Sequence, residues 1–157
     1  MPGLSFKHNF SAAIFQDGEV SRFKAVIRNN VREVMAALST RGPPVLNSKE
    51  AEVLACRKAL EFALNSDFAD IVLEGDNFVV MVAISSSCLL HSRLGHLYLN
   101  IHYLAMGLQV RSMSCVVRSA NSVAHSLARF ANCINDEIIW LEESPQQVLE
   151  ALYFDAH

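Results

Sequence analysis

Cysteine and histidine are the residue types whose chemistry is easiest to recognise in this sequence, because both bind zinc when they are suitably spaced. The four cysteines lie far apart, and no two of them form a CxxC pair or another spacing typical of zinc. Three histidines of one predicted helix are separated by five and six residues, which does not align them on one helical face. We therefore predict that the cysteines are reduced thiols in the core and that the histidines are surface or core residues and not metal ligands. The cysteines are Cys56, Cys88, Cys115 and Cys133, and the three histidines are His91, His96 and His102.

Two carboxylates, Glu52 and Asp76, lie within clear structural patterns. Glu52 belongs to a stretch with helical spacing, and Asp76 follows a short apolar run. Each has an ordinary interpretation, since Glu52 can be a solvated acid and Asp76 can cap the helix that follows it. Their types and positions alone therefore do not establish a shared site.

The composition predicts one well-packed domain. Hydrophobic residues make up 52% of the 157 residues, and a chain of this length buries roughly 70% of the surface that it exposes when unfolded. The longest apolar run, Phe78 to Ile84, has seven residues, whereas a membrane-spanning helix needs about 20. With no signal-peptide pattern after Lys7, we expect an intracellular protein, cytoplasmic or nuclear, without a membrane. The net charge of −3 lacks the basic excess of a dedicated nucleic-acid binder.

Alternating residues and turn signals predict three β-strands in the first forty residues. They are Phe10–Phe15, Phe23–Arg28 and Val31–Ser39, joined by turns at Gln16–Gly18 and Asn29–Asn30. Short turns between successive strands favour an antiparallel meander. The Gly-Pro-Pro sequence that follows ends the meander, because proline cannot donate to a strand ladder.

Helices and strands alternate in the rest of the chain. A helix is predicted from Ser48 to Leu64, with Asn47 and Glu50 resembling a capping box. Asp76 is placed to cap a second helix that runs through Ile84. The later elements are the strand Ile71–Leu73, the helix Leu89–Met106, the strand Gln109–Arg118, the helix Ser119–Ala131 and a tail, Ile138–Phe154, with a short helix after Ser144-Pro145.

This element order predicts an α/β fold with a mixed sheet. An antiparallel meander followed by alternating strands and helices implies five strands with helices on the faces of the sheet. We assign residues 1–157 to one domain, with a core of about 5–135 and a C-terminal tail at 136–157.

Several stretches resemble the plant ribonuclease H-like domain family, many of whose members are similar to the ends of retrotransposon polyproteins. The first strand resembles the family pattern K-x-N-x-D-x-A, and the first helix resembles A-E-A-x-A. A later stretch fits the helix pattern V-x-R-x-x-N-x-x-A-[DH]-x-L-A. The likeness extends over residues 5–150 and implies the ribonuclease H fold, an antiparallel meander followed by parallel strands. The stretches are Lys7–Ala13, Phe23–Leu38, Ala51–Ala55, Leu73–Asn77, Val117–Ala128 and Trp140–Pro145.

The resemblance implies hydrolysis of the RNA strand of an RNA–DNA hybrid by two magnesium ions that four acidic positions hold. Glu52 and Asp76 match the second and third of these positions. Ser11 stands at the first, where the family has an aspartate on the opening strand, and His125 stands at the last. Cys115 stands where a histidine is thought to assist proton transfer and product release.

Ser11 is the departure that most affects the implied metal site. A carboxylate about 4 Å from a divalent ion gains on the order of 8 kcal/mol at an effective dielectric constant of about 20, before desolvation. A serine hydroxyl brings no charge, and the missing carboxylate is the one that bridges both ions in the family. We therefore expect magnesium or manganese to be weakly bound or absent. A single manganese ion held by Glu52, Asp76 and His125 is the alternative.

The function that we predict is a ribonuclease H-like domain that binds nucleic acid and is catalytically impaired. Its partner would be an RNA–DNA hybrid or a structured duplex, bound weakly, or else a protein. Two alternatives stay open: an active metal-dependent hybrid ribonuclease, and a pure protein-interaction domain. The cations that could contact phosphates are scattered over the meander and the first helix: Arg22, Lys24, Arg28, Arg32, Arg57 and Lys58.

Overall fold

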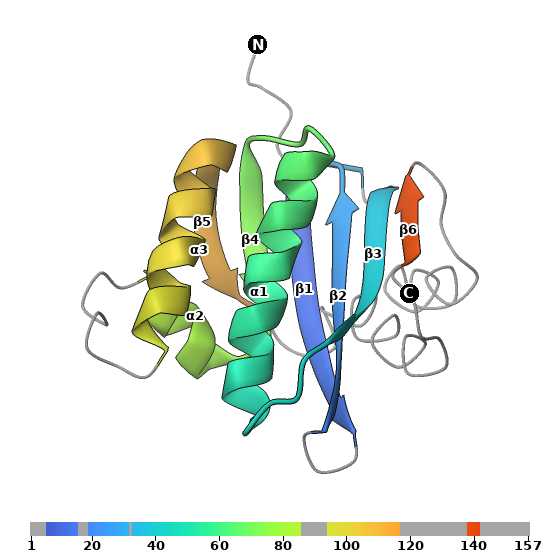
Figure 1. Cartoon of the computed structure of the whole chain (residues 1–157). Helices are drawn as coiled ribbons and strands as arrows, with labels where there is room; N and C mark the ends of the chain where they lie inside the picture. The colour runs from blue at the N-terminus through green and yellow to red at the C-terminus, as the bar shows by residue number, and fades with distance from the viewer. Residues whose placement is uncertain (1–5, 16–18, 32, 86–93, 117–137, 142–157) are drawn as a thin grey trace.

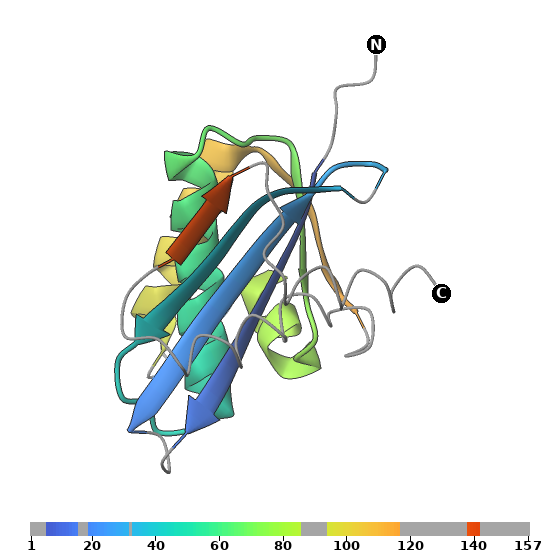
Figure 2. The same ribbon diagram turned by 90° about the vertical axis from the view of Figure 1, so that its right-hand side faces the viewer.

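One mixed β-sheet with helices on one of its faces makes up the part of the chain that the structure, a computed structural model, describes. The described residues are 6–15, 19–31, 33–85, 94–116 and 138–141. Their six strands follow the order β5-β4-β1-β2-β3-β6, with α1 and α3 against one face (Figures 1 and 2). The strands are β1 (Phe6–Phe15), β2 (Val20–Arg28), β3 (Val34–Gly42), β4 (Ile71–Gly75), β5 (Val110–Cys115) and β6 (Ile138–Leu141), and the helices are α1 (Ser48–Asn65), α2 (Phe78–Ser85) and α3 (Gly95–Leu108).

The first three strands form the predicted antiparallel meander. Phe10 of β1 pairs with Ala25 of β2, which pairs with Leu38 of β3. These three side chains are at most 1% exposed and belong to the hydrophobic core. Because side chains alternate between the two faces of a strand, Ser11 belongs to the next row, on the face away from this core.

Helix α1 begins where its sequence predicts. The Asn47 side chain caps it by accepting a hydrogen bond of 2.9 Å from the Glu50 backbone N–H. Alanines then recur every four residues along one line of the helix, and all of them are buried. Their small side chains let neighbouring elements approach the helix backbone closely. These alanines are Ala51, Ala55, Ala59 and Ala63.

The second half of the sheet is parallel, as predicted. β1 pairs with β4 from Phe6–Ile71 to Asn9–Glu74, and β4 pairs in parallel with β5. Parallel neighbours need a crossover connection, which α1 within the β3–β4 connection and α2 with α3 within the β4–β5 connection supply. The predicted fold class, a meander followed by parallel strands with flanking helices, is confirmed.

Several strand bounds differ from the prediction. β1 begins at Phe6 and not at Phe10, β2 begins at Val20 and not at Phe23, and β3 ends at Gly42 and not at Ser39. β3 begins at Val34 and not at Val31, because the Asn29 side-chain oxygen accepts hydrogen bonds from the backbone N–H groups of Val31 (3.0 Å) and Glu33 (2.9 Å) and lengthens the turn. The sheet also has a sixth strand in addition to the predicted five. β6 lies in the segment that was predicted only as a tail, and it pairs antiparallel with β3.

Later elements are only partly within the described residues. Within them, α3 begins at Gly95 and extends to Leu108, and β5 ends at Cys115. The predicted turn at 16–18, the start of the predicted helix at 89–93, the helix at 119–131 and the helix after Pro145 lie outside the described residues. In the described part of the chain, no helix is both long and apolar enough to span a membrane.

His8 is a polar side chain in an apolar setting. It is 0% exposed on β1, and its ring lies edge-on to that of Phe62 on α1, with ring centroids 6.4 Å apart. Neither ring nitrogen has a hydrogen-bond partner among the described residues. Burial lowers the pKa of His8 from its usual 6.5 to about 3, so the imidazole is neutral at physiological pH.

Acid should destabilise the fold through His8. The unfolded chain takes up a proton near pH 6.5 and the folded chain only near pH 3, so a fall in pH favours the unfolded state between these values. Between pH 7 and pH 5 this should lower the free energy of unfolding by about 2 kcal/mol. Urea unfolding at both pH values should show that His8→Leu removes this loss. His96→Leu, at an exposed histidine, should keep it. Equal pH dependence in the wild type and His8→Leu would contradict the assignment.

Candidate functional site

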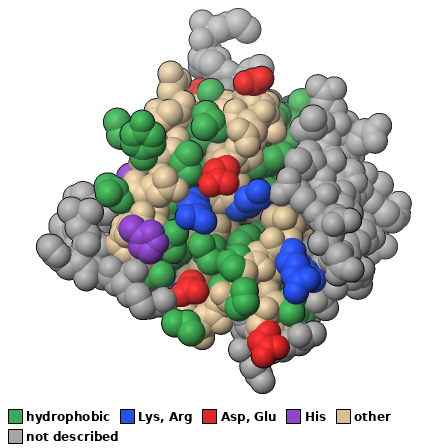
Figure 3. All heavy atoms as spheres, viewed as in Figure 1, with side chains coloured by type: hydrophobic (Ala, Val, Ile, Leu, Met, Phe, Trp, Pro, Cys, Tyr) green, Lys and Arg blue, Asp and Glu red, His purple; other side chains and the backbone are tan. Residues whose placement is uncertain are grey.

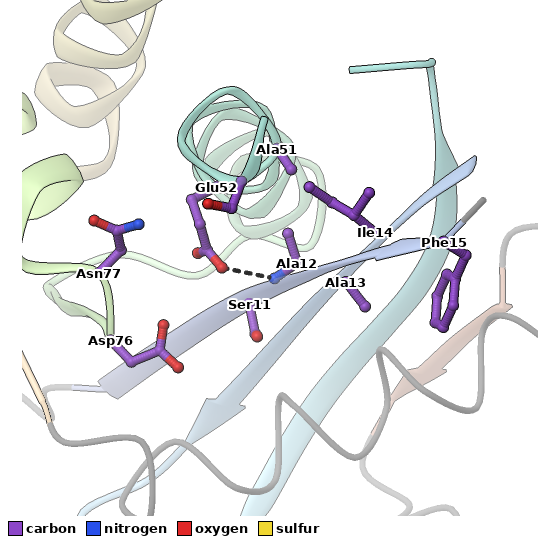
Figure 4. Close-up of a pocket in the computed structure, with 10 residues that line it drawn as sticks. Ser11, Ala12, Ala13, Ile14, Phe15, Ala51, Glu52, Asp76 and Asn77 are labelled. Atoms are coloured by element: carbon purple, nitrogen blue, oxygen red, sulfur yellow. Dashed lines mark hydrogen bonds between the residues drawn. The ribbon is translucent and has the colours of Figure 1, made fainter. Parts of the chain in front are cut away.

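A cleft opens where β1 and β4 separate. Their pairing ends at Asn9–Glu74, and β1 continues through Phe15 along an edge that β4 no longer covers. The cleft has a volume of about 610 Å³. It lies at the carboxyl ends of two parallel strands, which is where open α/β sheets commonly bind ligands. Its lining comprises Ser11, Ala12, Ala13, Ile14, Phe15, Ser48, Ala51, Glu52, Asp76 and Asn77 (Figure 4).

Glu52 reaches into this cleft from the second turn of α1. Its Oε1 accepts a hydrogen bond of 3.2 Å from the Ala12 backbone N–H, at the uncovered edge of β1 (Figure 4). The residue is 8% exposed. The carboxylate therefore joins the helix to the strand and is held at the predicted site.

Asp76 enters the cleft from the turn between β4 and α2. It was predicted to cap α2, and that prediction is wrong. The cap is Asn77, whose side-chain oxygen accepts a hydrogen bond of 3.1 Å from the Val80 backbone N–H. α2 begins at Phe78, so Asp76 lies one residue too early for this position. Asp76 lines the cleft instead (Figure 4).

The absence of a side chain at Gly75 allows β4 to pack close to the core and to position Asp76 in the cleft. A Cβ atom at Gly75 would lie 2.7 Å from the Phe10 ring and 2.9 Å from the Met81 sulfur. Both side chains are buried, so neither has free space into which to move. The close packing of β4 against the core thus requires glycine directly before the acidic residue.

Ser11 occupies the β1 position of the cleft and is 1% exposed. Its side chain leaves the strand on the side away from α1, whereas Glu52 approaches from the α1 side (Figure 4). Asp76 lies across the opening from Ser11 (Figure 4). The structure thus brings together three predicted positions, of which two carry carboxylates.

The structure does not add the other two predicted positions to this lining within the described residues. His125 lies outside the described residues. Cys115 ends β5 beside Gly75, but it is exposed and does not line the cleft. The prediction that it packs in the core is wrong, since Cys115 is exposed at the end of β5, an edge strand of the described sheet. Cys56 does fit the prediction of a core thiol, since burial, reinforced by the Glu52 charge, raises the pKa of its thiol.

The described residues do not fit a pair of magnesium ions. Among them, no group of three His, Cys, Asp or Glu side chains is arranged to hold a metal. Glu52 and Asp76 are the carboxylates of the cleft, and Oε1 of Glu52 already accepts the Ala12 N–H. The described lining therefore supplies two carboxylates, one for each ion of a pair.

Lys24 is a residue near the site that sequence reasoning counted only as a scattered cation. It pairs with Ser11 across the β1–β2 ladder and is 1% exposed. Desolvation lowers the pKa of its ammonium group well below the usual range, and the Glu52 charge partly opposes this shift. The sequence does indicate which face of β2 carries Lys24. Because side chains alternate along a strand, a residue between Phe23 and Ala25 faces away from the core.

Three cations that solvent can reach lie on the other side of α1. A second pocket, of about 230 Å³, is lined by Arg41 at the end of β3 and by Arg57 and Lys58 of α1, together with Glu61. Glu61 lies 3.9 Å from Arg57, an ion pair one helical turn apart. Seen from the α1 side, basic side chains form separate spots and not a continuous stripe (Figure 3).

The chain is similar in sequence to one protein family. The reverse transcriptase-like family matches residues 9–131. No curated protein matches the chain.

Solved structures of ribonucleases H share the fold. The ribonuclease H1 of the halophilic archaeon Halobacterium salinarum superposes with a TM-score of 0.74 and 22% identity, over 82% of this chain and 98% of that one. The N-terminal ribonuclease H domain of a Mycobacterium tuberculosis protein gives 0.70 and 19%, over 82% and 94%. LC11 ribonuclease H1, isolated from compost and solved with an RNA/DNA hybrid, gives 0.67 and 13%, over 78% and 92%. These likenesses show the ribonuclease H fold, and the plant and retrotransposon affinities stay predictions.

Gly75→Ala should destabilise the domain. Because the added methyl group meets Phe10 and Met81, overpacking should lower the free energy of unfolding by about 1–3 kcal/mol, measured by urea denaturation. The matched control is Gly107→Ala on α3, where a Cβ atom meets nothing within 4 Å. That change should stabilise the domain by about 0.5–1 kcal/mol, because alanine favours a helix over glycine. Two equal effects would contradict the packing assigned to Gly75.

Proposed function

The chain belongs to the reverse transcriptase-like family, and from this premise we propose that it is a ribonuclease H-like domain that binds nucleic acid without cleaving it efficiently. The RNA–DNA hybrid is its preferred duplex. The observation that carries the proposal is the convergence of Ser11, Glu52 and Asp76 on one cleft. β1, α1 and the end of β4 position the three residues, but position 11 carries a serine in place of the carboxylate of the family pattern.

The electrostatics of the cleft support the loss of hydrolysis. Ser11 places a neutral hydroxyl where the family pattern has a carboxylate, and the described residues leave two carboxylates, Glu52 and Asp76. Each missing carboxylate removes an attraction to a divalent ion of several kcal/mol, as an order of magnitude. A weakly bound single magnesium or manganese ion is compatible with the two acids, but two-metal catalysis requires a pair.

The cations that solvent can reach support binding to a phosphate backbone. Arg41, Arg57 and Lys58 line one pocket beside α1 and are accessible from solvent. Arg22, Lys24 and Arg28 of the meander are at most 7% exposed, so they do not offer their charge to a backbone at the surface. With a net charge of −3 and few accessible cations, binding should be weak and should depend on duplex shape.

Solved structures that share the fold support a nucleic-acid duplex as the partner. LC11 ribonuclease H1 was solved in complex with an RNA/DNA hybrid, and the foamy viral protease-reverse transcriptase was solved both with such a hybrid and with double-stranded DNA. We propose that this chain also binds an RNA–DNA hybrid, because its cleft is built on the same fold. A protein partner in place of nucleic acid stays the second prediction.

Fluorescence anisotropy with a labelled RNA–DNA hybrid tests the proposal. Affinity should fall steeply as salt rises, because phosphate contacts release counterions. The double variant Arg57→Gln/Lys58→Gln should reduce the slope of log affinity against log salt by about one for each phosphate that it no longer neutralises. Lys7→Gln removes an exposed charge from the start of β1 and should leave the slope unchanged.

Gel assays of the same labelled hybrid complete this test. Incubation with magnesium and then with manganese should leave the RNA strand intact. Cleavage that Asp76→Asn abolishes would show an active ribonuclease and contradict the proposed impairment. Failure to bind hybrid, double-stranded DNA and double-stranded RNA at low salt would contradict nucleic-acid binding and favour the protein-interaction alternative.

A further inference from the structure

Lys24 is the nearest cross-strand neighbour of Ser11. The two residues pair directly in the antiparallel β1–β2 ladder, and Lys24 pairs on its other side with Ser39 of β3. Residues directly opposite in such a ladder point to the same face, with Cβ atoms about 4.5–5.5 Å apart. The face is the one away from the core that contains Phe10 and Phe23. Any side chain placed at position 11 therefore lies against Lys24.

The burial of Lys24 is unusual for a lysine. The residue is 1% exposed, and its Nζ has no hydrogen-bond partner within the described ranges. Its row partners, Ser11 and Ser39, are equally buried and carry no charge. Buried amines are normally paired, because water that solvates them is lost on folding. The central strands thus hold a buried lysine directly opposite the position that lacks its carboxylate.

We propose that Lys24 selects against divalent metal in this cleft, so that the site departs from a two-metal site at two positions, Ser11 and Lys24. This inference rests on the proposed function, a domain that has lost its metal pair. A carboxylate at position 11 would be captured by the Lys24 amine, since opposite charges attract strongly where water is excluded. Restoring the acid alone therefore does not restore the metal site.

Calorimetric titration with magnesium, and then with manganese, tests this inference on four proteins: the wild type, Ser11→Asp, Lys24→Met and the double variant. Methionine keeps the length of the side chain and removes its amine. The wild type and both single variants should bind weakly. The double variant should bind at least about tenfold more tightly than Ser11→Asp, a step that corresponds to about 1.4 kcal/mol. Circular dichroism establishes that each variant is folded, and Lys24→Ala serves as a second neutral replacement.

Thermal unfolding without metal provides an independent measurement. Asparagine is the uncharged match for aspartate, so Ser11→Asp is compared with Ser11→Asn in the presence of Lys24 and again in the Lys24→Met background. With Lys24 present, the aspartate variant should melt about 2–4 °C above the asparagine variant, because the carboxylate pairs with the amine. In the Lys24→Met background this order should reverse, because the buried carboxylate then has no cation opposite it.

The outcomes separate this inference from the proposed function. Tight magnesium binding by Ser11→Asp alone would overturn the role of Lys24 and leave the impairment of the wild type standing. Equal, weak binding by Ser11→Asp and the double variant would also overturn it, as would melting differences that are the same in both backgrounds. Tight magnesium binding by the wild type would contradict the proposed function itself.

Discussion

The site depends on the short parallel pairing between β1 and β4. The pairing ends at Asn9 and Glu74, and beyond this point β4 no longer covers the edge of β1. That edge donates the Ala12 N–H that anchors Glu52, and the end of β4 brings Asp76 to the opposite side of the opening. The absence of a side chain at Gly75 allows β4 to pack against Phe10 at this place. One constraint on backbone pairing therefore creates the cleft and orients the two acids within it.

In the function that we propose, charge is what distinguishes this cleft from one that holds two metals. The scaffold is that of ribonucleases H, with TM-scores of 0.74 and 0.70 to two of them. The central strands, however, place Ser11 and Lys24 directly opposite each other in the β1–β2 ladder, where our account would need negative charge. The cations that solvent can reach lie beside α1, in the pocket of Arg41, Arg57 and Lys58. In our account, the fold keeps a surface for duplex binding while the chemistry of its cleft has changed.

The sequence predicted those features that local patterns determine. Alternation identified the meander, the Asn47 cap identified the start of α1, and the motifs located Ser11, Glu52 and Asp76, which the structure brings to one cleft. It did not predict features set by tertiary context. β6 is a strand because β3 offers it an edge, and Cys115, at the end of the edge strand β5, is exposed. The role of Lys24 required the register between two strands, which alternation within one strand does not supply.

The central claim is that this cleft receives a duplex without holding two catalytic metals. The most direct measurement is the anomalous scattering of manganese in crystals of the domain bound to an RNA–DNA hybrid. We predict that the hybrid backbone lies against the cleft and that no pair of manganese peaks lies between Glu52 and Asp76. Two peaks about 4 Å apart at these carboxylates would contradict the account, because that spacing is characteristic of two-metal catalysis.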